Sequence, residues 1–239
     1  MKEKHIAIVL AAGRGKRMQS AVQKQYLLLG GKPVLYYSLR AFQKCSFIDE
    51  IVLVTQEEEI SYCENEIVKK YSLDKVKKIV SGGAERYLSV YEGLKSIDTC
   101  DYVYIHDGAR PFLNQEILSR VYDGVREYKA CVAAMPSKDT IKIGDEESFA
   151  KTTPDRSHVW MVQTPQVFEF GRIKHAYRKL IEMGITSVTD DAMVLETVGE
   201  GRIRLIEGDY RNIKITTPED LEIAEIFLKK GVDKNRQEC

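Results

Sequence analysis

The chain has 239 residues, enough for one large α/β domain or two small ones, and its 36 basic and 36 acidic residues leave no overall positive field that would favour nucleic acid. Five cysteines without a C-x-x-C pair argue against a disulfide framework and a zinc knuckle. No stretch reads as a signal peptide or as an apolar run of about 20 residues, so we expect a cytoplasmic protein without a membrane span.

Apolar stretches of strand length alternate along the chain with amphipathic stretches typical of helices. The expected strands are Ile6–Leu10, Ile51–Thr55, Val76–Val80, Tyr102–His106, Cys131–Met135, Val159–Val162 and Ile203–Ile206. Alternation of this kind predicts an α/β fold in which a mostly parallel sheet carries helices on both faces. We expect a single domain over residues 1–239.

Two of the expected helices show a buried stripe of apolar residues. Helical spacing connects Tyr87, Val90, Tyr91 and Leu94 in one of them, and Leu118, Val121, Val125 and Tyr128 in the other. A last helix is expected to begin at Pro218, because Thr217 is a suitable N-cap and two acidic residues follow the proline.

Residues 139–152 depart from this alternation. They read as two short strands around a polar turn, and no helix follows them. Such a hairpin, placed within an arm at about residues 137–158, is either a contact for a partner subunit or an ordinary solvated hairpin.

The loop after the first expected strand is suited to bind phosphate groups. Gly13 and Gly15 allow the backbone to bring its N–H groups against oxygen atoms, and Arg17 and Lys24 add full positive charges. A dinucleotide fingerprint would need a third glycine at Met18, and no G-K-[ST] follows, so the loop is neither that motif nor a P-loop. We interpret it as a triphosphate-binding loop; the alternative is a solvated basic turn.

Polar residues also follow other strands at the edge where open parallel sheets bind ligands. Gly82 and Gly83 precede a helix, and Asp107 follows the fourth expected strand. A carboxylate facing a triphosphate is repelled unless Mg²⁺ lies between them, so Asp107 is a candidate metal partner, with an ion pair to Arg110 as the alternative. We interpret His106 as a packed histidine and not as a catalytic base, since no nucleophile is paired with it.

Separated cations, a carboxylate and no evident nucleophile suit a displacement at phosphorus in which the substrate supplies the nucleophile. Attack on the α-phosphorus of a nucleoside triphosphate expels pyrophosphate. Arg110, Arg156 and Lys214 lie far along the chain from the first loop and could hold a second anion such as a phosphomonoester.

The chain closely resembles the 2-C-methyl-D-erythritol 4-phosphate cytidylyltransferase family between Ile6 and about Leu228. The motifs that carry the resemblance are, in order, L-A-A-G-x-G-x-R-M with K-Q, G-G-x-x-R-x-x-S-V, H-D-G-A-R-P, K-D-T, D-R-x-x-x-W-x-x-Q-T-P-Q, T-D-D-A and N-I-K-I-T-x-P-E-D-L. The resemblance implies a Rossmann-like mixed sheet of the nucleotide-diphospho-sugar transferase type, a projecting β-arm used in homodimerisation, and Mg²⁺ dependence. It implies the reaction of CTP with methylerythritol phosphate to give the CDP-alcohol and pyrophosphate.

The resemblance also implies roles for individual residues. Arg17 and Lys24 match the pair that stabilises the transition state, and Arg156 and Lys214 match the residues that position the substrate phosphate. The implied nucleotide contacts are Ala11, Ala12, Gly13, Gly15, Gly83, Ser89 and Asp107, the last also as metal partner, and the implied substrate contacts are Arg110, Thr140 and Thr189. In the family, the arm residues matching Thr140 and Arg156 reach the site of a neighbouring subunit.

The sequence departs from the family pattern at Gln23, where proline is common, at Ser137, where valine is usual, and at Ala84, where an acidic residue is frequent. The last departure puts one ribose contact in question. Two alternatives stay open: a ribitol-5-phosphate cytidylyltransferase, against which the D-R-x-x-x-W and K-D-T segments argue, and a catalytically inert nucleotide-binding protein on the same fold. Arg17 and Lys24 argue against the second.

Overall fold

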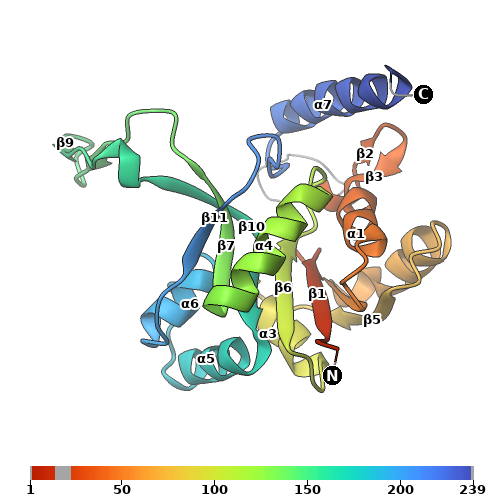
Figure 1. Cartoon of the computed structure of the whole chain (residues 1–239), viewed down its shortest axis with the longest axis horizontal. Coiled ribbons are helices and arrows are strands. Elements are labelled where there is room, and N and C mark those ends of the chain that lie inside the picture. The colour runs from red at the N-terminus through yellow and green to blue at the C-terminus, as the bar shows by residue number, and fades with distance from the viewer. Residues whose placement is uncertain (1, 14–22, 238–239) are drawn as a thin grey trace.

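The structure is a computed structural model that describes residues 2–13 and 23–237, with side chains as far as residue 230. Its centre is a seven-stranded sheet in the order β11-β7-β10-β6-β1-β4-β5 (Figure 1). The strands are β1 (His5–Leu10), β4 (Glu50–Thr55), β5 (Val76–Ser81), β6 (Tyr102–Asp107), β7 (Ala130–Pro136), β10 (Trp160–Glu169) and β11 (Arg204–Glu207). Each expected strand therefore has a counterpart.

The sheet is mostly parallel, as predicted, with one reversed strand. β10 runs antiparallel to both of its neighbours, β6 and β7, and it is ten residues long, much longer than the expected strand at 159–162. In the parallel part, Leu10 lies opposite Val54 on one side and Asp107 on the other. The carboxyl ends of β1, β4 and β6 therefore meet at one edge of the sheet.

Helices cover both faces, in agreement with the predicted α/β fold (Figure 1). Strand side chains alternate between two cores: Val9 and Leu53 pack on one face, and Ile8 and Val52 on the other. The helices are α1 (Val34–Lys44), α2 (Ile60–Tyr62), the π-helix η4 (Cys63–Lys69), α3 (Arg86–Ser96), α4 (Gln115–Tyr128), α5 (Phe170–Glu182), α6 (Asp191–Thr197) and α7 (Pro218–Gln237).

The amphipathic stripes agree with these helices with one exception. Leu118, Val121 and Val125 of α4 are buried in the core on one face of the sheet. Tyr128 was expected to continue that stripe but is 40% exposed, because it is the last residue of the helix and its ring lies 5.1 Å from the guanidinium of Arg204. The stripe therefore ends one turn earlier than its spacing suggests.

The C-terminal helix α7 begins at Pro218, as expected. The carboxylate of Asp220 accepts hydrogen bonds from the backbone N–H groups of Thr216 and Thr217 at 2.8 and 2.9 Å, which satisfies donors just before the helix. Ala224 of α7 packs with Leu29 and Val34 in a third, smaller core. No described helix has both the length and the apolar character that crossing a bilayer requires.

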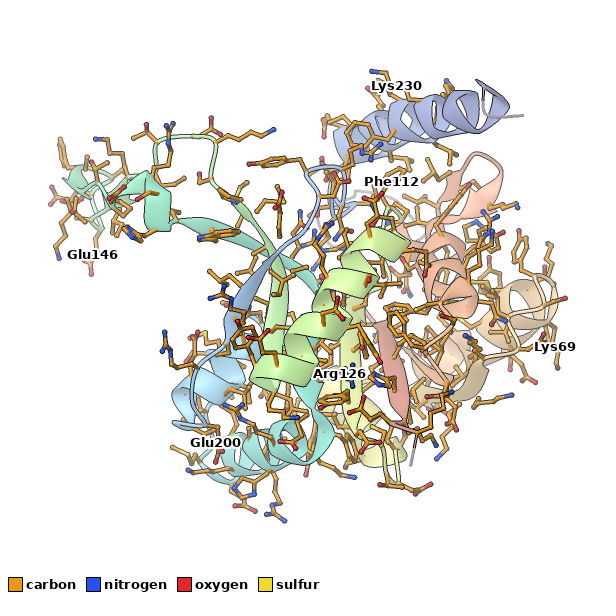
Figure 2. All side chains as sticks on the ribbon, viewed as in Figure 1. Lys69, Phe112, Arg126, Glu146, Glu200 and Lys230 are labelled. Atoms are coloured by element: carbon orange, nitrogen blue, oxygen red, sulfur yellow. The ribbon has the colours of Figure 1, made fainter. Side chains whose placement is uncertain are left out.

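The remaining elements are short. They are the 3-10 turns η2 (Lys24–Tyr26), η3 (Glu57–Glu59) and η5 (Arg156–His158), the hairpin of β2 (Leu28–Leu29) with β3 (Lys32–Pro33), and the hairpin of β8 (Ile143–Gly144) with β9 (Ala150–Thr152). Figure 1 shows the β8–β9 hairpin at the end of a long excursion from the sheet, between β7 and β10, and Figure 2 shows Glu146 at this end of the molecule. Phe149 on this hairpin is 69% exposed, so the excursion presents apolar surface to its surroundings.

Candidate active site

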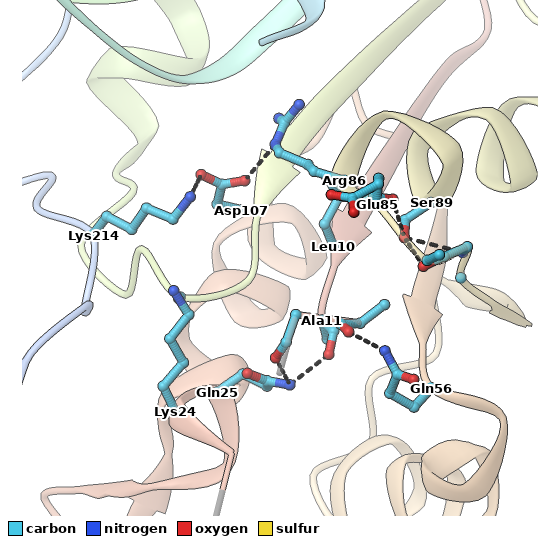
Figure 3. Close-up of a pocket in the computed structure, with 16 residues that line it drawn as sticks. Leu10, Ala11, Lys24, Gln25, Gln56, Glu85, Arg86, Ser89, Asp107 and Lys214 are labelled. Atoms are coloured by element: carbon cyan, nitrogen blue, oxygen red, sulfur yellow. Dashed lines mark hydrogen bonds and ion pairs between the residues drawn. The ribbon is translucent and has the colours of Figure 1, made fainter. Parts of the chain in front are cut away.

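A cavity of about 650 Å³, called here the first cavity, opens at the carboxyl ends of β1, β5 and β6 (Figure 3). This is the edge at which an open parallel sheet binds its ligand. Among the residues expected to bind the nucleotide or stabilise the transition state, the lining includes Ala11, Ala12, Gly13, Lys24, Gly83, Ser89 and Asp107. Gly15 and Arg17 lie outside the described residues.

One wall of the first cavity is the turn between β5 and α3. A methyl group at Gly82 would lie 2.6 Å from the Cβ of Ala12 and 2.8 Å from the Oγ of Ser89, so this position accepts only glycine without rearrangement. The hydroxyl of Ser89 accepts a hydrogen bond from the N–H of Gly83 at 3.1 Å and lies 3.1 Å from the carbonyl of Glu85. Ser89 therefore fixes the backbone that leads into α3, whose N-terminal end faces the cavity.

The opposite wall is the segment that follows β1. Gln25, which is buried, donates from Nε2 to the carbonyl of Ala11 at 2.5 Å and to that of Gly13 at 3.2 Å. Gln56 donates to the carbonyl of Ala12, and Figure 3 shows Gln25 and Gln56 on either side of Ala11. These bonds set the peptide planes of residues 11–13. The K-Q motif contains Gln25, but nothing in the sequence indicated that Gln25 and Gln56 act together.

Asp107 lies at the end of β6 within a group of cations. Its Oδ2 is 2.8 Å from the Nζ of Lys214 and 3.7 Å from the Nε of Arg110, and its Oδ1 is 3.3 Å from the Nε of Arg86. Burial alone would raise the pKa of this carboxyl, but the charges of the three cations hold the pKa of Asp107 well below its usual range. Asp107 is therefore an ionised carboxylate that holds the cations in place.

Arg86 connects this group to the start of α6. Its Nη1 and Nη2 donate to the two oxygens of Asp191 at 2.9 and 2.8 Å, and the hydroxyl of Tyr177 donates to the same carboxylate at 2.6 Å. Neither Arg86 nor Asp191 is among the site residues expected from the sequence, although both lie within the motifs given above. No local spacing connects two residues that are 105 positions apart.

A smaller cavity of about 250 Å³, called here the second cavity, adjoins the first. Arg110 and Thr189, two of the expected substrate contacts, line it. Lys214, Asp107 and Arg86 line both cavities, so they form the boundary between them. Arg110 is held by its Nη1, which donates to the carbonyl of Asn212 at 2.7 Å.

Thr140 and Arg156 are not brought to either cavity of the same chain. Both are exposed on the excursion that carries the β8–β9 hairpin, and neither is among the residues that line the two cavities. Arg156 donates from Nη1 to the carbonyl of Lys138 at 3.2 Å, within the same excursion. If they act on a substrate, a second chain must supply the site that they reach.

His106 is a packed residue, as expected. Its side chain is fully buried, with Nδ1 2.9 Å from the hydroxyl of Thr164 and Nε2 3.3 Å from the carbonyl of Arg110. Burial lowers the pKa of His106 to about 4, so the ring is neutral at ordinary pH. Its contacts support the loop that carries Arg110.

The described residues contain no group of three or more His, Cys, Asp or Glu side chains that could hold a metal ion by themselves. Asp107 nevertheless offers a buried, ionised carboxylate at the edge of the first cavity. Mg²⁺ commonly binds one or two carboxylates together with the phosphate oxygens of a substrate. Both oxygens of Asp107 are paired with cations, so its carboxylate fits an Mg²⁺ ion for which a triphosphate supplies most of the ligands.

Two adjoining cavities with cations at their boundary can place two anionic reactants side by side. Comparisons with known proteins identify the chemistry more closely. The family model for 2-C-methyl-D-erythritol 4-phosphate cytidylyltransferase matches residues 5–230. The protein of that name from Lachnospira eligens is 54% identical over 224 residues, which cover 93% of this chain and 98% of the relative.

Solved structures agree with the sequence relatives. The structure of 4-diphosphocytidyl-2C-methyl-D-erythritol synthase from Anaerococcus prevotii matches with a TM-score of 0.84 and 34% identity, covering 96% of this chain and all of that one. The structure of 2-C-methyl-D-erythritol 4-phosphate cytidylyltransferase from Thermus thermophilus matches with a TM-score of 0.74 and 27% identity, covering 93% and 98%. The chain belongs to the 2-C-methyl-D-erythritol 4-phosphate cytidylyltransferase family.

Proposed function

We infer that the chain is a nucleotidyltransferase that transfers CMP from CTP to 2-C-methyl-D-erythritol 4-phosphate and releases pyrophosphate, a step of non-mevalonate isoprenoid precursor synthesis. Besides family membership, one observation supports this inference: the two cavities adjoin and share Asp107 and Lys214. A reaction between two anionic substrates requires neighbouring sites with cations between them.

CTP is assigned to the first cavity. The fixed peptide groups of residues 11–13, together with Gly83 and Ser89, suit the polar edge of a cytosine base. Lys24 lies on the same cavity, and Figure 3 shows its side chain extending toward the side where Lys214 and Asp107 lie. We assign Lys24, with Arg17, to the charge that develops on the α-phosphate and on the departing pyrophosphate.

The polyol phosphate is assigned to the second cavity, where Arg110, Thr189 and Lys214 supply cationic and hydroxyl groups for its phosphate. An oxygen of this phosphate attacks the α-phosphorus of CTP. The new bond joins that oxygen to the phosphorus, and the bond from the α-phosphorus to the oxygen that leads to the β-phosphorus breaks. Lys214 lies at the boundary of the cavities, where both phosphates would meet.

We propose Mg²⁺ as the cofactor, with Asp107 as its direct or water-mediated partner in the chain. When bound, the ion neutralises charge on the triphosphate and favours departure of pyrophosphate. The chain's own contribution is to keep Asp107 ionised, which the neighbouring cations Arg86, Lys214 and Arg110 do.

We propose that the arm at about residues 137–158 makes a homodimer and carries Thr140 and Arg156 to the second cavity of the partner. Three observations support this: both residues lie away from the cavities of their own chain, Phe149 is exposed, and Ile143 is 50% exposed. Deleting Ile143–Phe149 should shift the sedimentation of the protein from dimer to monomer. A deletion variant that still sediments as a dimer would exclude this arm as the contact.

The reaction is tested by a paired substrate assay. Purified protein with CTP and Mg²⁺ should release pyrophosphate with a higher kcat/KM for 2-C-methyl-D-erythritol 4-phosphate than for ribitol 5-phosphate. A higher kcat/KM for ribitol 5-phosphate would identify the sister activity instead. Turnover of neither substrate, with CTP binding retained, would identify an inert nucleotide-binding protein.

A further inference from the structure

We propose that Arg86 is a positioning residue for this reaction, which Asp191 and Tyr177 hold in place so that it fixes the carboxylate of Asp107 between the two cavities. The proposal rests on the proposed function, because it assigns Arg86 to the alignment of the two substrates. It concerns residues on α3, α5, α6 and β6 that are far apart in the sequence.

The geometry of Arg86 leaves it one orientation. Its two terminal nitrogens face the two oxygens of Asp191 at 2.9 and 2.8 Å, and such a fork sets both the plane and the rotation of a guanidinium group. The Nε then points at Oδ1 of Asp107 at 3.3 Å. Figure 3 shows Arg86 and Lys214 on opposite sides of Asp107.

Asp191 is itself fixed. Its side chain is fully buried, and one oxygen accepts the 2.6 Å hydrogen bond from Tyr177, which is also fully buried. Its backbone N–H donates to Oε1 of Gln166 at 3.0 Å, and so does the N–H of Ala192 at 2.9 Å. Asp191 lines neither cavity, and of Arg86 and Tyr177, the two residues that its carboxylate contacts, only Arg86 does, so the carboxylate acts on the reaction through Arg86.

Arg86 matters for the reaction because Asp107 is held from two sides. Lys214 pairs with Oδ2 and Arg86 with Oδ1, and Lys214 is the residue assigned to the substrate phosphate. Without Arg86, Oδ1 of Asp107 is released, and both carboxylate oxygens can turn toward Lys214 and Arg110 and compete with the second substrate for these cations. The backbone contacts expected for the cytosine base, at residues 11–13, do not involve Arg86. Loss of Arg86 should therefore lower kcat much more than it weakens CTP binding.

The test compares Arg86→Lys, Arg86→Gln, Asp191→Asn and Tyr177→Phe with the wild type, with kcat measured at saturating concentrations of both substrates. Arg86→Lys keeps a positive charge but cannot form the fork, and we expect kcat to fall roughly 10- to 100-fold, the range for substrates that are misaligned by about 1 Å. Asp191→Asn should give a similar fall and Tyr177→Phe a smaller one. In all four variants the dissociation constant of CTP, measured by calorimetry, should change less than about threefold.

Two comparisons separate positioning from a general loss of structure. The double variant Arg86→Gln with Asp191→Asn should be no slower than Arg86→Gln alone, because Asp191 acts only through Arg86. Leu180→Ala, in the same core as Tyr177 but outside this network, should lower the unfolding temperature and leave kcat unchanged. The proposal would be overturned if the decreases in kcat of the two single variants multiplied in the double variant. It would also be overturned if the variants weakened CTP binding more than they lowered kcat.

A crystal structure of Asp191→Asn supplies a readout that does not depend on turnover. We expect the Arg86 guanidinium to rotate away from its present plane and Oδ1 of Asp107 to leave its contact with the Nε of Arg86. An unchanged Arg86 and Asp107 would refute the anchoring role. If the wild type turned over neither polyol phosphate, the proposed function would be wrong. The structure of Asp191→Asn would still show whether Asp191 anchors Arg86 and whether Arg86 holds Asp107.

Discussion

The first cavity takes most of its lining from segments that directly follow the neighbouring strands β6, β1, β4 and β5, whereas the second takes its lining from β10 and from residues far apart in the sequence. Residues 11–13 and the turn at Gly82 and Gly83 belong to the first, and Arg110, Thr189 and Lys214 to the second. Backbone groups held by Ser89 and Gln25 have fixed geometry and suit a flat base with a defined polar edge. Charged side chains suit a small phosphorylated alcohol, whose recognition is mainly electrostatic.

The largest expected effect tests the catalytic side of the first cavity. Lys24→Ala should lower kcat by about 10²- to 10³-fold, the range for loss of one charge partner of a transition state, with little change in the KM for CTP. Steady-state kinetics with both substrates varied measures this. Lys32→Ala, a lysine close by in the sequence that lines neither cavity, serves as the matched control. A rise in KM alone would make Lys24 a ground-state binding residue.

Asp107 belongs to both cavities, so its substitution tests whether they are distinct. Asp107→Asn should lower kcat by about 10²-fold and raise the Mg²⁺ concentration that gives half of the maximal rate, because a charged oxygen is lost from the proposed metal partner. Titration of the rate with Mg²⁺ measures both quantities. Asp49→Asn, whose carboxylate pairs with Lys2 elsewhere, is the control. An unchanged Mg²⁺ requirement would exclude Asp107 as a metal partner and leave it the role of holding the neighbouring basic side chains in place.

Arg156→Ala tests whether the second cavity is completed by another chain. The KM for the polyol phosphate should rise about tenfold, the order expected for one charge-assisted contact, and the KM for CTP should stay unchanged. If the arm serves its neighbour, mixing Arg156→Ala with Lys24→Ala after dissociation should raise the rate, measured well below the wild-type KM for the polyol phosphate, to about one quarter of wild type, because about half of the dimers are mixed and each has one intact site. No restoration, despite exchange of subunits, would contradict action on the neighbour.

The smallest expected effect concerns the backbone of the first cavity. Gln25→Leu keeps the approximate volume but removes the donor to the carbonyls of Ala11 and Gly13, so the peptide groups beside the base lose their fixed orientation. We expect the KM for CTP to rise about fivefold, equivalent to about 1 kcal/mol, the net contribution of one hydrogen bond between the base and a peptide group that loses its orientation. Binding of the polyol phosphate should be unaltered. An equal rise in both KM values would show that Gln25 supports the whole edge of the sheet.

The contrast between features set by neighbouring residues and features set by residues far apart in the chain also explains what the sequence could predict. The strands, the glycines at their ends and Asp107 are visible because each depends on local patterns of apolar and small residues. The reversal of β10 between β6 and β7 is not, since an apolar strand looks alike in either direction. Arg86 and Asp191 pair across 105 positions, and Gln25 and Gln56 act on carbonyl groups that carry no sequence signal. The proposed role of Arg156 depends on its position relative to a second chain, which cannot be worked out from the sequence of one chain.

The reversed strand β10 has a consequence for how the chain tolerates changes in length. It leads from the arm, past the second cavity at Gln163 and Thr164, to the start of α5, which carries Tyr177. An inserted residue in the turn between β8 and β9 would leave the pairing of the central sheet unchanged. An inserted residue between 166 and 169 would shift the pairing of β10 with β6 and turn Phe168 out of its core. Length variation among relatives should therefore be rarer within β10 than in the turn between β8 and β9, a pattern that an alignment can check.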